Sequence, residues 1–95
     1  MIIKTNLKFK GLRDYLHGTD ILNTVTITLS NIFSGYISKL ILRKFSKKQM
    51  SIHLTKPPKV VEIFGTGLWQ VDENLSKEFW LSNNGDLITE RYDYN

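Results

Sequence analysis

The residues best suited to chemistry lie together in one short polar stretch. His17 is followed by Gly18 and Thr19, and Asp14 and Asp20 lie on either side. A neutral imidazole at a helix entrance can act as a general base, and the amides at a helix start can hold an anion or an oxyanion. His17 is therefore a candidate base, with the two aspartates as orienting groups. The alternative is a loop histidine whose hydrogen bonds are made by the local backbone, with Asp20 as a helix cap.

The rest of the sequence predicts no other kind of reactive site. His53 lies between Ile52 and Leu54 in a strand-like run and faces the other side of that strand, which predicts a surface position. The two histidines are distant in sequence and no cluster of further ligands accompanies them, so we predict no metal site. The absence of Cys excludes disulfides and thiolate chemistry. Gly65-Thr66-Gly67 lacks the rest of a dinucleotide-binding loop, so no cofactor is predicted.

A helix over residues 20–33 is expected to position the polar stretch. Its apolar residues recur on one stripe at helical spacing, and Gly35 can end it. Two alternatives remain open. The run of β-branched residues from Thr24 to Thr28 is typical of a strand, and the helical spacing also continues far enough to allow a helix as far as Phe45. The stripe consists of Ile21, Leu22, Val25, Leu29, Ile32 and Phe33.

The remaining apolar runs predict about six strands, most of them antiparallel neighbours. A polar turn joins the second and third runs into a predicted hairpin, and Asn84-Gly85 joins the last two into another, because this dipeptide tolerates the backbone angles of a tight turn. With the helix, these strands predict a single α+β domain over residues 1–95. The runs cover residues 2–9, 36–45, 50–54, 60–64 with a continuation past a bulge at 68–71, 78–81 and 87–90.

Basic and acidic residues are divided unequally along the chain. Residues 1–59 carry eleven Lys and Arg against two acids, whereas residues 60–95 carry two against seven, and the net charge is +4. This division indicates either a site for an acidic ligand, or attraction between the two parts within one fold or between two copies. Six basic residues interleaved with aromatic ones form a candidate patch for phosphates. They are Lys8, Lys10, Arg43, Lys44, Lys47 and Lys48.

The composition predicts an ordinary globular domain of a reducing compartment. The chain has 95 residues, of which 41% are hydrophobic and 23% charged, and it has no Cys. The first residues lack the apolar block of a signal peptide, and no run approaches the roughly 20 apolar residues of a membrane span. We therefore expect a cytoplasmic protein that does not enter a membrane.

Two segments resemble proteins of the hot-dog fold. Residues 13–22, Arg-Asp-Tyr-Leu-His-Gly-Thr-Asp-Ile-Leu, resemble the loop and helix entry of that family. Residues 39–64, from Lys-Leu-Ile-Leu-Arg-Lys-Phe through Met-Ser-Ile-His-Leu to Val-Val-Glu-Ile-Phe, resemble its later strands. The resemblance implies a central helix wrapped by a curved antiparallel sheet. It also implies a homodimer, an acyl-thioester carried on acyl carrier protein or coenzyme A, and dehydratase or thioesterase chemistry.

The resemblance also implies roles for residues near the helix. His17 corresponds to the loop histidine of the dehydratases, which works with a helix acid from the other subunit, while Gly18 and Thr19 supply backbone to the oxyanion. Leu22, Val25 and Leu29 would line a tunnel for the acyl chain. No Asp or Glu occurs from Ile21 to Gln49, so a domain that binds the ligand without catalysis remains open. The alternatives are a binding module whose basic part docks nucleic acid or an acidic protein, with nucleic acid the less favoured, and a structural subunit.

Overall fold

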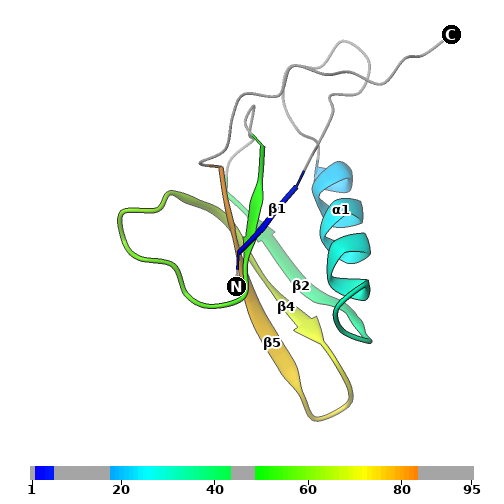
Figure 1. The fold of residues 1–95 in the computed structure, drawn as a ribbon. Coiled ribbons are helices and arrows are strands. Elements are labelled where there is room, and N and C mark those ends of the chain that lie inside the picture. Colours follow the sequence, from blue (N-terminus) through cyan, green and yellow to red (C-terminus); the bar gives the residue numbers. More distant parts are fainter. Residues whose placement is uncertain (1, 6–17, 44–48, 84–95) are drawn as a thin grey trace, which may run out of the picture.

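One helix packs on one face of a five-stranded antiparallel sheet (Figure 1). The structure is a computed structural model that describes residues 2–5, 18–43 and 49–83. The predicted α+β class is confirmed for these residues, and the predicted strand at 87–90 lies outside them. In chain order the elements are β1 (Ile2–Lys4), α1 (Gly18–Ser30), β2 (Tyr36–Leu42), β3 (Ser51–His53), β4 (Ile63–Gln70) and β5 (Ser76–Ser82).

The expected helix is present, although it begins and ends earlier than the sequence predicted. Ile21, Val25 and Leu29 follow one another at helical spacing, and all three are buried against the sheet. Their burial outweighs the low helix propensity of the β-branched run, since packing of an apolar face provides most of the stability of a protein helix. The helix ends where the amides of Ile32 and Phe33 both donate to the carbonyl of Leu29, at 3.0 and 2.8 Å.

The strands follow the order β1-β3-β5-β4-β2, and every neighbouring pair is antiparallel. The hairpin predicted between residues 36–45 and 50–54 is therefore wrong, because β2 pairs with β4 while β3 pairs with β1 and β5. The predicted continuation from 60–64 into 68–71 is confirmed, because β4 is one strand with a register shift between Ile63 and Gly65, but the strand begins at Ile63 and not at Val60. No helix among the described residues is long and apolar enough to cross a membrane.

The core lies between α1 and the sheet. Trp69, the largest buried side chain, is held there by its indole N–H, which donates to the Ser34 carbonyl at 3.0 Å. Gly67 leaves room for the ring of Phe79 on the neighbouring strand. Each large apolar side chain removed from water contributes about 1.5–3 kcal/mol to folding. The buried apolar residues are Ile21, Val25, Leu29, Met50, Ile52, Phe64, Trp69, Phe79 and Leu81.

Candidate functional site

The entrance of α1 holds the part of the predicted site that the structure describes. The predicted catalytic residues His17 and Asp14 lie outside the described residues. Asp20 lies inside them, and its position differs from the expected cap. Because α1 begins at Gly18, Asp20 belongs to the first helical turn, where it is only 8% exposed. The sequence did not predict this burial. Because the helix begins earlier than expected, Asp20 supplies an acid on the central helix, whereas residues 21–49 contain no Asp or Glu.

The surroundings of Asp20 combine helix amides with apolar side chains. The first amides of a helix have no carbonyl partner within it, and the helix dipole favours negative charge there. Asp20 therefore lies where an acidic group is stabilised. Gly18 lies beside the end of β2, where a methyl group on it would be 3.7 Å from Cδ1 of Leu42. A buried carboxylate next to helix amides can accept hydrogen bonds from a ligand, transfer a proton or orient a histidine.

The three residues expected to line an acyl tunnel differ in their environment. Val25 and Leu29 are fully buried within the core, where they pack with the aromatic residues of the sheet. Leu22 is 38% exposed. Of these three side chains, Leu22 is therefore the one with surface available to a ligand at the entrance of α1.

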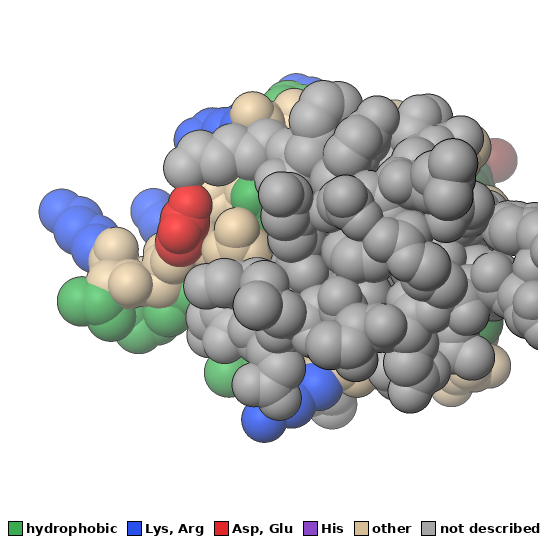
Figure 2. All heavy atoms as spheres, turned by 90° about the horizontal axis from the view of Figure 1, so that it is seen from above, with side chains coloured by type: hydrophobic (Ala, Val, Ile, Leu, Met, Phe, Trp, Pro, Cys, Tyr) green, Lys and Arg blue, Asp and Glu red, His purple; other side chains and the backbone are tan. Residues whose placement is uncertain are grey.

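The predicted basic patch falls largely outside the part of the chain that the structure describes. Arg43 is described and exposed. The described Lys and Arg side chains that are visible in Figure 2 lie at several places around the outline of the molecule. Lys8, Lys10, Lys44, Lys47 and Lys48 lie outside the described residues.

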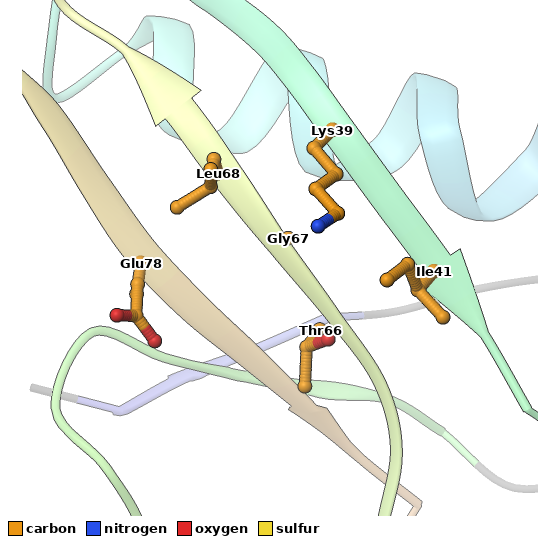
Figure 3. Close-up of a pocket in the computed structure, with 6 residues that line it drawn as sticks. All are labelled: Lys39, Ile41, Thr66, Gly67, Leu68 and Glu78. Carbon is orange, nitrogen blue, oxygen red and sulfur yellow. The ribbon is translucent and has the colours of Figure 1, made fainter.

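A hollow of about 280 Å³ opens on the face of the sheet opposite α1 (Figure 3). Lys39 from β2 and Glu78 from β5 stand on opposite sides of it, so the hollow presents both charges. No local sequence pattern indicates this hollow, because it is assembled from three strands whose pairing is not local. Its floor and walls are Lys39, Ile41, Thr66, Gly67, Leu68 and Glu78.

The predicted surface position of His53 is wrong. Its side chain is 4% exposed, and its Nε2 lies 2.7 Å from Oγ of Ser82, which is fully buried. Ser51, which pairs with Ser82 across the ladder, is also buried. Burial lowers the pKa of His53, because desolvation disfavours the charged imidazole. The alternation along β3 placed His53 correctly on the face opposite Ile52, but it could not show that this face is covered too.

Among the described residues, no group of three or more His, Cys, Asp or Glu side chains could hold a metal ion. No protein-family model matches the chain, and comparisons with curated proteins and with solved structures found no match.

Proposed function

We propose that this chain is a small acyl-thioester-binding domain whose site is the entrance of α1. The observation that supports this proposal best is the burial of Asp20 on the first turn of the central helix. Burial of a carboxylate requires compensating contacts, and the first amides of α1 are a place where such contacts can be made. In the hot-dog dehydratases, which this sequence resembles, an acid on the central helix works with a loop histidine. Asp20 would be that acid here, with His17 as its partner.

The chemistry follows from the groups at the helix entrance. Helix-start amides polarise a thioester carbonyl by donating hydrogen bonds to its oxygen. The carboxylate of Asp20 would exchange a proton with the acyl chain, or orient the histidine that does so. Leu22 would provide the first apolar contact for the acyl chain. Positive charge in the first part of the chain would attract the phosphates of coenzyme A or the acidic surface of an acyl carrier protein.

We further propose that the domain works as a homodimer formed through β2. This strand lies at the edge of the described sheet and pairs there only with β4. It exposes Tyr36, at 61%, and an exposed apolar edge strand is a template for pairing with another chain. Antiparallel pairing of two copies centred on Leu40 would set Lys39 opposite Ile41 and so keep the basic residues of the two copies from facing one another. Such an interface is self-complementary, as a twofold dimer requires.

Binding and turnover of acyl-coenzyme A and acyl carrier protein thioesters of increasing chain length would test the proposal. We expect Asp20→Asn, which removes the charge with little change in shape, to reduce binding or turnover at least tenfold, as loss of one charge-assisted contact of about 1.5 kcal/mol or more requires. The control is Glu73→Gln, an exposed acid between β4 and β5, which should behave as the wild type. Absence of thioester binding, or equal effects of the two substitutions, would contradict the proposal.

A second candidate function is docking of an acidic protein or a nucleic acid on the face of the sheet opposite α1. The exposed Lys39 beside the hollow on that face favours it. Binding of an oligonucleotide that weakens steeply with salt, and weakens again in Lys39→Gln, would support this candidate, because counterions are released when phosphates are neutralised. Binding that depends neither on salt nor on Lys39→Gln would exclude this candidate function.

A further inference from the structure

The sheet contains a short seam between two groups of strands. The ladder between β4 and β5 extends from the Ile63–Ser82 pair to the Gln70–Ser76 pair. The ladder between β3 and β5 extends only from Ser51–Ser82 to His53–Trp80. β1 is attached to the sheet solely through β3 in the described chain. The β1–β3 pair is thus joined to the larger unit of α1, β2, β4 and β5 by the short β3–β5 ladder, which we call the seam.

A buried polar pair lies on this seam. His53 comes from β3 and Ser82 from β5, and their Nε2 and Oγ atoms are 2.7 Å apart. Neither position is accessible to solvent, since both side chains lie on the face opposite α1 and are covered there. A neutral imidazole can accept a hydrogen bond from the serine hydroxyl or donate one to the serine oxygen, depending on its tautomer. An imidazolium at the same place would carry a charge into a buried environment, which costs several kcal/mol unless an acid compensates it.

On the described neighbouring strands, no acid lies beside His53 in the register. In the register, β1 places the apolar Ile2 opposite His53, and the next residue of β1 on that face is Lys4. β5 contributes the uncharged Trp80 and Ser82 to the same face, and its acid, Glu78, lies further along the strand and lines the hollow.

β4 and the amino terminus add no negative charge near the seam. β4 contributes the uncharged Thr66 opposite Trp80. The positive charge of the amino terminus acts in the same direction as burial on the pKa of His53. The connection between β3 and β4 carries both signs. Its charged residues are Lys56, Lys59 and Glu62.

We propose that the seam is an acid-sensitive joint: protonation of His53 separates the β1–β3 pair from β5, while α1, β2, β4 and β5 remain folded. The geometry supports a local opening, because the seam is short and the charge would appear between its two strands. The opening would uncover Ile52 and Met50, which are fully buried in the closed state, and so present an apolar surface only in acid. This inference does not depend on the function proposed for the entrance of α1.

The direction of the pH dependence follows from the two states of the histidine. The folded pKa of His53 lies below its ordinary value of 6.5, so the closed seam binds fewer protons than the open one. The stabilisation by neutral His53 is therefore complete above about pH 6.5 and is lost as the pH falls through 6.5 toward the folded pKa. Across that interval the opening constant should rise by up to about tenfold for each pH unit, which corresponds to one proton.

Hydrogen exchange followed by nuclear magnetic resonance tests the proposal on the full chain. Between pH 7.5 and about 5.5, after correction for intrinsic exchange rates, the amides of Ser51 and His53, which face β5, should lose protection by about tenfold per pH unit at most. The amides of Val25 and Leu68, in α1 and β4, should keep theirs. Equal loss of protection in all four would mean global unfolding and would overturn the local joint.

Three substitutions identify the titrating group. The chain has only two histidines, so His53→Gln should abolish the pH dependence, whereas His17→Gln should leave it intact. Ser82→Ala should lower the protection of β3 at pH 7.5 and retain the acid response, because His53 is still present. Loss of the response in His17→Gln would overturn the proposal. If His53→Gln does not fold, the pKa of His53 can be measured in the wild type from the shift of its ring C–H resonances with pH. A pKa at or above 6.5 excludes the joint.

Discussion

Gly35 should be the least replaceable residue between α1 and β2. Its φ angle is +125°, a conformation that a residue with a side chain rarely adopts. A methyl group there would overlap the carbonyl oxygen of Gln70 and approach the indole nitrogen of Trp69 at 3.0 Å. The strained backbone costs about 1–3 kcal/mol, and displacing the packed neighbours costs a similar amount. We therefore expect Gly35→Ala to lower the free energy of unfolding by about 2–6 kcal/mol.

The loss can be measured by urea titration and by thermal unfolding followed by far-ultraviolet circular dichroism. For a domain of this size each kcal/mol corresponds to roughly 4–8 °C, so the melting temperature should fall by more than about 8 °C. The matched control is Gly18→Ala in the first turn of α1. There the methyl group meets only Cδ1 of Leu42 at an ordinary contact distance of 3.7 Å, and alanine should be neutral or stabilise by up to about 1 kcal/mol. If Gly35→Ala costs less than about 1 kcal/mol, the reasoning from backbone angle and contact is refuted.

Two further predictions concern the packing of the sheet. Trp69→Phe should lower the free energy of unfolding by about 1–3 kcal/mol, because the Ser34 carbonyl loses its indole donor and a void remains. The same change at the less buried Trp80 should cost less in a urea titration. Equal costs would argue against a contribution from the hydrogen bond. Gly67→Ala should cost about 1–3 kcal/mol, because the added methyl group overlaps the ring of Phe79 and lies 2.6 Å from the Lys39 carbonyl oxygen. That cost should shrink in a Phe79→Leu background, and an unchanged cost would exclude the ring as its cause.

The helix could be predicted because its information is local. Ile21, Val25 and Leu29 lie on one stripe in any helix through this segment, and all three are in the core, whereas Leu22 and Ile32 of the predicted stripe are exposed. The exact start could not be read from the sequence. Both Thr19 and Asp20 are good caps, and the structure uses neither in that role because the helix already begins at Gly18. This small shift moves Asp20 from the boundary into the helix and changes what the site can do.

The strand pairing could not be predicted from local signals. The polar turn after Phe45 suggested that β2 pairs with β3 as a hairpin, but the order of the strands depends on packing between residues distant in sequence. Gly65 and Gly67 on β4 leave room for Leu42 of β2 and Phe79 of β5, so β4 accepts a close neighbour on each side. Such a fit depends on residues distant in sequence. Sequence periodicity shows which residues share a face, but it does not show which strand lies beside it.

Asp20 and His53 are the two buried titratable side chains of the described chain, and they lie on opposite faces of the sheet. Replacement of a buried polar group by a well-packed apolar one is often neutral or stabilising, so such groups are candidates for function. The two sites should respond independently, because α1 lies on one face of the sheet and His53 on the other, and distant substitutions usually add. Asp20→Asn should alter thioester binding and leave the acid response of β3 unchanged. His53→Gln should abolish the acid response and leave thioester binding at neutral pH unchanged. Coupling between the two effects would mean that acid opening of the seam regulates the helix entrance, and would join both proposals in one mechanism.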